Sequence, residues 1–336
     1  MKQQIDEFIE YMDKIKGTSR NTLLSYRRDL MRMAAYMQER GITDASLVTE
    51  DAVQDYCTEL RNENFAPASI TRHSTSIKSF FRYMLENGNI TENPAEKIKS
   101  PKIEKKQPRV LTAVEIENLL SQDFGKDPKG LRDRAILELM YSTGLKASEV
   151  INLNLSNVDL SLSCIRLAKK GSDKVRLIPY GRKAKEALQS YLTGGRNKLL
   201  ECRSNGEIER NETEGEGLSS MPEGESSMHE GESGMPEDVS SMHDDESRLF
   251  LNCSGIPMSR QGLWKLIKNY VEKAGIRSDI TPFTLRHSFA MHLIDNGADI
   301  ASVQELMGYS DSNTVSKYIG KKKSTGDPYE WARIRN

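Results

Sequence analysis

The sequence lacks a long apolar run, because no stretch of its 336 residues approaches the ~20 apolar residues that a membrane-spanning helix needs. The opening stretch MKQQIDEFIE is too charged for a signal peptide, so we expect a cytoplasmic protein without a membrane partner. Cysteines are also few and far apart, with no Cys-x-x-Cys or Cys/His pair, which argues against a zinc site and a disulfide framework. We expect four reduced, structural thiols: Cys57, Cys164, Cys202 and Cys253.

The chain also lacks an excess of positive or negative residues, because 48 Lys and Arg nearly balance 49 Asp and Glu. A net charge of −1 ordinarily argues against a nucleic-acid partner. However, residues 204–247 hold 14 acidic residues and one basic residue, Arg210. The remaining chain therefore has 47 basic residues against 35 acidic ones, a net charge of +12 (47 − 35), which is typical of a DNA-binding protein.

The acidic segment contains four consecutive seven-residue units, SSMPEGE, SSMHEGE, SGMPEDV and SSMHDDE, over residues 219–246. Each unit offers one Met, whereas a coiled coil needs two apolar positions per heptad, so the pattern predicts disorder. His229 and His243 are 14 residues apart among hydrated acids, a weak ligand set, and we predict no metal site. We favour a tandemly expanded surface loop. The alternative is an acidic segment that competes with DNA for the basic face or recruits a partner.

Residues 1–92 show helical periodicity. Residues 23–37 place apolar side chains at three- and four-residue intervals before Gly41, and residues 70–85 do the same before Gly88. The pattern predicts a small, all-helical N-terminal domain. Its polar helix faces carry basic residues, which either contact DNA or are ordinary solvated surface. They are Arg20, Arg27, Arg28, Arg72, Lys78 and Arg82.

Residues 93–110 predict a basic domain linker. The segment contains three prolines and six Lys or Arg against two acids, and it has no apolar periodicity. Its charge suits it to lie along a phosphate backbone. The linker lysines that we expect to contact DNA are Lys102, Lys105 and Lys106.

Residues 111–320, outside the acidic insert, predict a second domain that begins with helices. Thr112 and Glu115 have the spacing of a capping box. A helix is expected over about 131–143, where Gly144 stops it, and another over 263–274.

Short β-rich runs lie between these helices. Residues 163–168 and 174–180, joined by a turn with lysine and glycine, predict a hairpin, and residues 249–252 predict a third strand. The expected fold class is mainly α, with a mixed α/β second domain that is mostly helical around a small antiparallel sheet.

Four stretches, in order and at family spacing, resemble the tyrosine recombinase (phage integrase) family and within it the bacterial Xer-type recombinases. They are STGLKASEVINL at 142–153, AKKGSDKVRLIPY at 168–180, residues 254–276, and TPFTLRHSFAMHLIDNGADIASVQELMGYSDSNTVSKY at 281–318. The resemblance covers about residues 3–320 without the insert. It implies a helical SAM-like core-binding domain and a catalytic domain that close on duplex DNA. The implied assembly is a tetramer on two sites, either a homo-oligomer or a hetero-oligomer with a recombinase paralogue.

The resemblance also implies a reaction without metal or nucleotide cofactors. Tyr318 stands at the position of the nucleophile that forms a 3′-phosphotyrosine, and Arg286 at the position of the second phosphate-binding arginine. Lys170 is the best match for the lysine of the hairpin, with Lys169 as the competitor. Relatives dock a tail like that at 321–336 on a neighbouring protomer, and the alternative is that Trp331 packs on its own protomer.

Three positions depart from the catalytic pattern. Lys146 stands where the first phosphate-binding arginine belongs and keeps its charge without the bidentate fork. Phe283 stands where the family has a histidine, and its ring cannot transfer a proton. Tyr309 replaces histidine or tryptophan and keeps a hydroxyl that can reach a phosphate oxygen.

These departures leave two functions open. The first is a site-specific recombinase of reduced activity, because losing one donor and one acid–base group removes about 10⁴–10⁷ in rate. The second is a recombinase-fold DNA-binding protein that no longer cuts and has an architectural or regulatory role. Loss of the fork at Lys146 and of the imidazole at Phe283 fits holding DNA better than cutting it.

Overall fold

The computed structural model describes residues 1–99, 101, 109–168, 175–204, 247–276 and 280–309. The chain divides into two compact units, one formed by the N-terminal helices and one by the elements after residue 105. Among the residues described, no helix combines the length and the apolar character needed to cross a bilayer.

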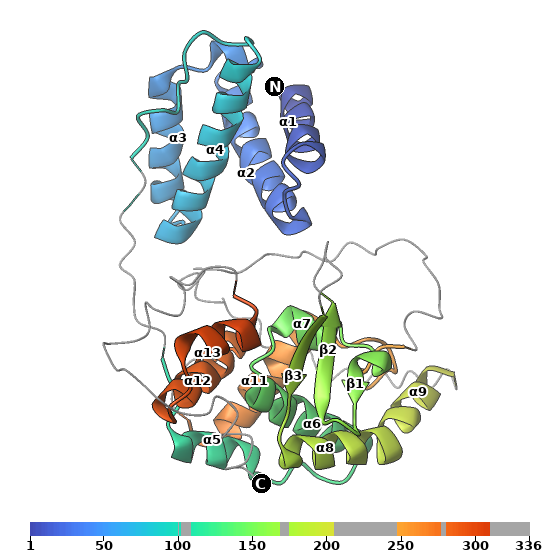
Figure 1. The fold of residues 1–336 in the computed structure, drawn as a ribbon. Coiled ribbons are helices and arrows are strands. Elements are labelled where there is room, and N and C mark those ends of the chain that lie inside the picture. Colours follow the sequence, from blue (N-terminus) through green and yellow to red (C-terminus); the bar gives the residue numbers. More distant parts are fainter. Residues whose placement is uncertain (100, 102–108, 169–174, 205–246, 277–279, 310–336) are drawn as a thin grey trace. The chain divides into compact units, whose positions relative to one another are not determined.

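The N-terminal unit is a bundle of four helices (Figure 1). Its helices are α1 (Lys2–Lys14), α2 (Arg20–Glu39), α3 (Glu50–Asn62) and α4 (Pro67–Glu86), with a short 3₁₀ turn at Ala45–Leu47. The hydroxyls of Ser19 and Thr49 cap α2 and α3, and Pro67 opens α4 at a position where a missing N–H costs nothing. The two helices expected from periodicity are confirmed as α2 and α4.

The core of this unit is built from the apolar stripes of all four helices, with Phe8, Met33 and Phe80 among its fully buried residues. Ala95 and Ile98 are buried in the same core. The composition assigns both residues to the linker, yet the start of that segment packs as part of the bundle.

The second unit contains eight described α-helices around a small sheet. The helices are α5 (Ala113–Leu120), α6 (Pro128–Thr143), α7 (Ala147–Ile151), α8 (Arg182–Gly194), α9 (Arg196–Ser204), α11 (Arg260–Lys273), α12 (Pro282–Asp295) and α13 (Ile300–Met307), with a 3₁₀ turn at Leu155–Asn157. Figure 1 shows α12 and α13 on one flank and the strands on the other.

The local signals for helix ends are confirmed. Thr112 and Glu115 form the capping box of α5. Gly144 ends α6 in the left-handed conformation, at a φ of 58°. Thr281 caps α12 and Pro282 is its first residue.

The sheet has three antiparallel strands in the order β1-β2-β3. They are β1 (Val158–Asp159), β2 (Cys164–Ala168) and β3 (Val175–Pro179), and the β2–β3 pair is the predicted hairpin, with Ile165 opposite Ile178. The third strand predicted at 249–252 is wrong. Its first three residues are buried, but among the described residues the run forms no strand ladder: one isolated bridge joins Leu251 to Pro257, and another joins Arg248, just before the run, to Asn154.

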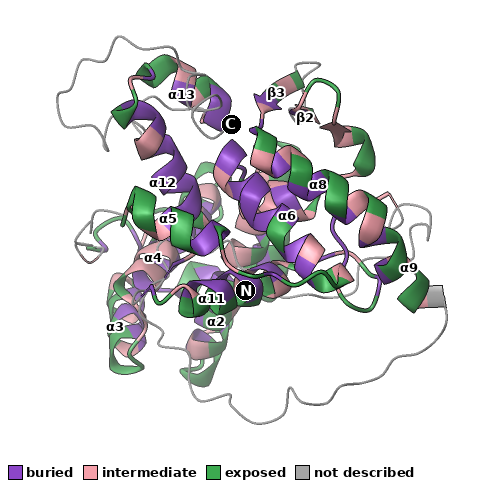
Figure 2. Ribbon diagram, turned by 90° about the horizontal axis from the view of Figure 1, so that it is seen from below, coloured by how far each residue is buried: buried purple, intermediate pink, exposed green. Residues whose placement is uncertain are grey.

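Helix α12 lies largely in the interior of the second unit (Figure 2). Leu285, Phe289 and Leu293 pack into the core, and the Ser288 hydroxyl accepts a hydrogen bond from the Leu111 N–H at 2.8 Å. The helix is therefore held along most of its circumference, which fixes the position of any polar side chain that it carries.

Candidate active site

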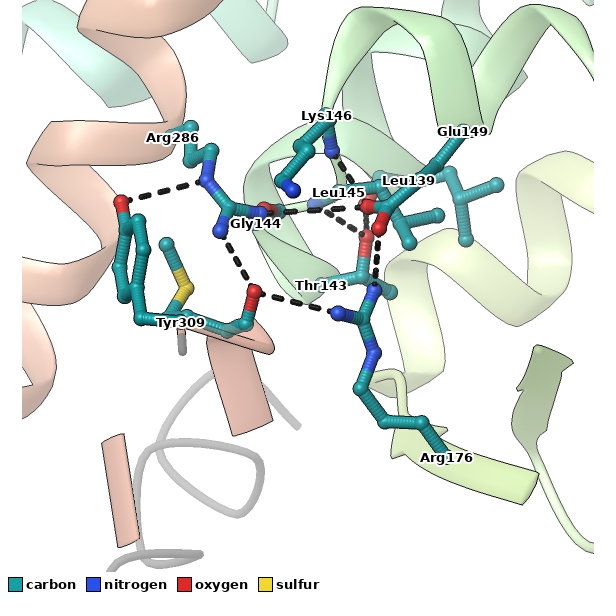
Figure 3. A network of polar contacts seen from close by, with 10 residues as sticks. Leu139, Thr143, Gly144, Leu145, Lys146, Glu149, Arg176, Arg286 and Tyr309 are labelled. Atoms are coloured by element: carbon teal, nitrogen blue, oxygen red, sulfur yellow. Dashed lines mark hydrogen bonds and ion pairs between the residues drawn. The ribbon is translucent and has the colours of Figure 1, made fainter. Parts of the chain in front are cut away.

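Arg286 is the centre of a polar cluster in the second unit (Figure 3). It lies one turn into α12, and its guanidinium donates three hydrogen bonds. Nε donates to the Tyr309 hydroxyl at 3.3 Å, Nη2 to the Met307 carbonyl at 2.5 Å, and Nη1 to the Gly144 carbonyl. Only 4% of the residue is exposed, and its hydrogen bonds come from two separate segments, one at Gly144 and one at residues 307–309.

A guanidinium has five N–H groups. On Arg286, three of them donate the hydrogen bonds just described. Among contacts with the described residues, two N–H groups remain without an acceptor, one on each terminal nitrogen. This pair has the spacing of the bidentate fork that binds carboxylate or phosphate. The guanidinium also lies over the Tyr309 ring, 4.7 Å from its centroid, which stabilises the cation in place. Because Arg286 is almost fully covered, an incoming anion must displace one of the groups that shield the fork.

Arg176 on β3 joins the same cluster. Its Nη1 donates to the Met307 carbonyl at 3.1 Å, and its Nη2 donates to Glu149 Oε1 at 2.9 Å. The other carboxylate oxygen of Glu149 accepts the Lys146 N–H at 2.8 Å and lies 4.0 Å from Nη1 of Arg286. One carboxylate and one carbonyl oxygen thus connect the sheet, the start of α7 and the two arginines.

Lys146 lies at the start of α7 and is exposed. Figure 3 shows its side chain pointing toward Arg286. The cluster therefore gathers three cations, Lys146, Arg176 and Arg286, against the single carboxylate of Glu149. This excess of positive charge, with an unused fork at its centre, can bind an anion such as a phosphate.

The aromatic side chains of α12 contact one another or Tyr141. Phe283 exposes 43% of its surface and stacks on His287, with ring centroids 6.1 Å apart and planes 2° from parallel. The His292 Nδ1 pairs with the Tyr141 hydroxyl at 2.9 Å. Burial lowers the pKa of both histidines below the ordinary value, which favours neutral imidazoles at neutral pH.

Several residues predicted from the sequence lie outside the described residues. Tyr318 is one of them, and so are the two candidate lysines of the hairpin turn and the three candidate lysines of the linker: Lys169, Lys170, Lys102, Lys105 and Lys106. Their roles stay predictions. Of the remaining catalytic candidates, the structure brings Lys146, Arg286 and Tyr309 together, with Phe283 at the start of the same helix as Arg286.

The three candidate residues of the N-terminal unit have different surroundings. Arg72 is half-buried and pairs with Asp29, with Nη2 3.1 Å from Oδ1. Lys78 donates from Nζ to the Ile98 carbonyl at 2.9 Å, so its ammonium holds the start of the linker. Arg82 is exposed. A solvated helix face accounts for Arg82 alone, because the other two cations have structural partners.

Sequence reasoning missed Glu149 and Arg176. A signal for Glu149 existed, because it follows Lys146 by three residues at a helix start, where a carboxylate can accept an N–H of the first turn. Arg176 had a weaker signal as a charged residue within a predicted strand. Neither pattern reveals that the two residues contact each other across 27 positions of sequence.

The candidate site contains no set of metal ligands. Within the described ranges, no group of three or more His, Cys, Asp or Glu residues is arranged to hold an ion. Glu149 is the only carboxylate of the described cluster, and its oxygens are engaged by Arg176 and Lys146.

The sequence model of the Phage integrase family matches residues 109–325, and that of the phage integrase N-terminal SAM-like domain matches residues 5–88. These matches span most of the chain. The chain therefore belongs to the phage integrase family of tyrosine recombinases, and the fold class expected from the sequence is confirmed.

Curated relatives cover nearly the whole chain. The tyrosine recombinase XerD of Listeria innocua is 34% identical over 95% of this chain and 94% of the relative. XerD of Halalkalibacterium halodurans is 35% identical over 95% and 93%. The tyrosine recombinase XerC of Herpetosiphon aurantiacus is 33% identical over 100% and 96%.

Solved structures share the fold. The Tn1549 transposon integrase in complex with circular intermediate DNA matches with a TM-score of 0.63 at 18% identity and covers 98% of each chain. The XerH site-specific recombinase bound to its difH substrate matches with a TM-score of 0.63 at 17% identity, over 96% of this chain and 82% of that one. At these identities the likeness concerns the fold.

Proposed function

We propose that this protein is a site-specific DNA recombinase that cleaves duplex DNA through Tyr318. The observation that carries the proposal is the Arg286 guanidinium at the centre of a cluster with excess positive charge, where two of its N–H groups donate to no described residue. Relatives named XerD and XerC, and DNA complexes of proteins with the same fold, support a DNA phosphate as the anion.

The chemistry would proceed as a transesterification. The Tyr318 oxygen attacks the scissile phosphorus and loses its proton, the bond from phosphorus to the 5′ oxygen breaks, and a 3′-phosphotyrosine forms. The 5′ oxygen takes up a proton and leaves as a hydroxyl, and Lys170 is the proposed donor. Arg286 and Lys146 would stabilise the charge that develops on the non-bridging oxygens.

Tyr309 takes a defined part in this proposal. Its hydroxyl accepts a hydrogen bond from Nε of Arg286 at 3.3 Å. Because a hydroxyl can accept and donate at once, the Tyr309 proton stays available for a phosphate oxygen beside the arginine fork. Tyr309 thus keeps a hydroxyl donor at the position where the family has histidine or tryptophan.

We further propose that cleavage is slow. Lys146 supplies a point charge where a fork would bind two oxygens, and Phe283 supplies no polar atom. Each missing donor costs about 10²–10³ in rate. Restoring them should therefore accelerate cleavage.

The test uses a duplex that the protein selects from a random pool, nicked so that a cleaved strand cannot be religated. The wild-type protein should form a covalent adduct on denaturing gels, and Tyr318→Phe should abolish it. Tyr309→Phe is the matched control, because it removes a hydroxyl from the same site and should slow adduct formation without preventing it. The double variant Lys146→Arg, Phe283→His should form the adduct at least about 10²-fold faster.

Two outcomes would count against the proposal. An adduct that survives Tyr318→Phe would move the nucleophile to another residue. Full DNA binding without any adduct, even in the Lys146→Arg, Phe283→His variant, would instead establish a protein that holds DNA without cutting it.

The oligomer belongs to the same proposal. Recombination exchanges strands between two sites, so we propose assembly of several protomers on DNA, with copies of this chain or a paralogue. Light scattering of the protein with and without the selected duplex measures the stoichiometry, and one protomer per duplex under all conditions would contradict assembly.

A further inference from the structure

Phe283 has an unusual environment for a phenylalanine. The chain contains eight phenylalanines, all of them in described segments, and only Phe283 is exposed. Six of the others are buried and Phe65 is half-buried. An exposed ring forgoes the stabilisation that burial of its apolar surface would provide. Because singly exposed apolar side chains are common on protein surfaces, the 43% exposure of Phe283 points to a ligand only together with the residues around it.

The ring of Phe283 stacks on a buried neighbour. It is the second residue of α12, after Pro282, and it lies parallel to the His287 imidazole one turn further along. His287 is 4% exposed, so its ring cannot move aside without disturbing the core. A side chain that already stacks on a buried ring loses less conformational freedom, when another ring stacks on its free face, than a side chain without such a contact.

The charges beside Phe283 narrow the class of ligand. Arg286 follows Phe283 by three residues, a spacing that places two side chains side by side on a helix. The cluster of Arg286, Arg176 and Lys146 with Glu149 attracts anions, which disfavours an apolar peptide or a lipid tail at this ring. A nucleotide, in contrast, carries an anionic phosphate and an aromatic base a short distance apart. Sites that bind unpaired bases combine a positively charged track with aromatic side chains in this way.

We propose that Phe283 is a stacking platform for one nucleobase of the bound DNA, adjacent to the phosphate that Arg286 holds. This inference rests on the proposed binding of DNA at Arg286, and not on cleavage. The base must leave the helical stack to reach the ring, so the contact would favour a duplex that is open next to that phosphate. A histidine at this position could donate to the phosphate, whereas phenylalanine would hold the neighbouring base.

The first experiment measures affinity for the selected duplex over a range of salt concentrations. Phe283→Ala should weaken binding about 5- to 150-fold, the range expected for loss of one stacked base, and Phe283→Trp should keep it. The slope of log affinity against log salt should stay the same, because stacking releases no counterions. Ile256→Ala is the control, because Ile256 is equally exposed, at 44%, and lies on another segment. It should leave affinity unchanged.

The second experiment locates the base. A series of duplexes, each with one abasic position, is titrated with wild-type protein and with Phe283→Ala. At one position, and only there, the abasic site should weaken wild-type binding and abolish the difference between the two proteins. A 2-aminopurine at that position should report stacking through its fluorescence in the wild-type complex and lose this signal with Phe283→Ala.

The outcomes separate this inference from the proposed function. Equal affinity of wild type and Phe283→Ala, or a difference that persists at every abasic position, overturns the stacking platform and leaves the recombinase proposal intact. A wild-type protein that binds no duplex overturns both. Binding and stacking without any covalent adduct support the stacking platform, and they contradict only the proposed cleavage.

Discussion

Arg176 and Arg286 donate hydrogen bonds to the same acceptor, the carbonyl oxygen of Met307, from 3.1 Å and 2.5 Å respectively. Two like charges converge on one oxygen because Glu149 lies between them and offsets part of their repulsion. Arg176 comes from β3, directly after the hairpin turn, whereas Arg286 comes from α12. The shared carbonyl therefore couples the position of the hairpin to that of the arginine fork.

Replacing Arg176 should show this coupling. Arg176→Met removes a half-buried ion pair with Glu149 and a bond to Met307, so we expect the second unit to lose about 1–3 kcal/mol of unfolding free energy. We also expect slower formation of the covalent adduct, with a smaller effect on DNA affinity. Urea unfolding followed by tryptophan fluorescence measures the stability of this unit, because Trp264 lies on its helix α11.

Arg166→Met is the control for this substitution. Arg166 lies on the neighbouring strand and pairs with Asp159, but half of its side chain is exposed, so its loss should cost less than about 1 kcal/mol. Equal effects of the two substitutions on stability and on the adduct would contradict a positioning role for Arg176.

Gly308 makes room for Arg176. A Cβ at this glycine would lie 1.8 Å from Nη1 of Arg176, and its φ of +64° already disfavours other residues. Gly308→Ala should therefore destabilise the second unit by the cost of a left-handed residue, about 1–2 kcal/mol, plus the cost of displacing the arginine, about 1–3 kcal/mol. Urea unfolding of the full chain measures both together.

Gly275→Ala isolates the backbone cost, because Gly275 has a similar φ of +69° and no atom within 4 Å of a built Cβ. The excess of Gly308→Ala over Gly275→Ala should largely disappear when Arg176→Ala is present in both proteins. If the two glycine substitutions cost the same in the wild-type background, Gly308 does not accommodate the guanidinium in solution.

The features of the fold that the sequence predicted correctly depend on local signals. The caps at Thr112 and Thr281 and the stop at Gly144 were predictable, because each depends on residues within one helical turn. The prediction of a strand at 249–252 was wrong, because burial and β-propensity alone do not extend an isolated bridge into a ladder. A strand needs a neighbour in register, and that neighbour is set by the tertiary structure.

The same distinction holds for the candidate site. Lys146, Arg286 and Tyr309 were predictable from a family pattern, and three segments of the structure bring them together. The place of Arg176 in the cluster was not predictable, because its contacts with Glu149 and Met307 span 27 and 131 positions of sequence. The exposure of Phe283 was also out of reach, since an apolar residue at the start of a helix is ordinarily assigned to the core.

A buried network in the N-terminal unit predicts a pH effect. Asp29 is 1% exposed and lies 3.3 Å from the His73 Nε2, and His73 pairs with the Tyr56 hydroxyl at 3.1 Å. Burial raises the pKa of Asp29 to about 7 and lowers the pKa of His73 to about 4. The aspartate therefore contributes stability that is lost as pH rises from about 4 to about 7. The histidine contributes stability that is lost as pH falls from 6.5 to about 4.

These two trends have opposite signs and nearly cancel in the wild-type protein between pH 4 and 6.5. Relative to wild type, Asp29→Asn should gain stability as pH rises through this window, and His73→Gln should lose it, each by at most about 1.4 kcal/mol per pH unit. Hydrogen exchange of the α2 and α4 amides, corrected for the intrinsic rate, reports on this unit. Slopes of the same sign for both variants would contradict the assignment.

The salt dependence of DNA binding should separate Arg82 from Lys78. If the exposed Arg82 neutralises a phosphate, Arg82→Ala lowers the slope of log affinity against log salt by about 0.9. The Lys78 ammonium is instead bound to the Ile98 carbonyl at 2.9 Å. Lys78→Ala should therefore leave the slope nearly unchanged and destabilise the N-terminal unit by about 1 kcal/mol. Equal decreases in slope for the two variants would mean that Lys78 leaves Ile98 when DNA binds.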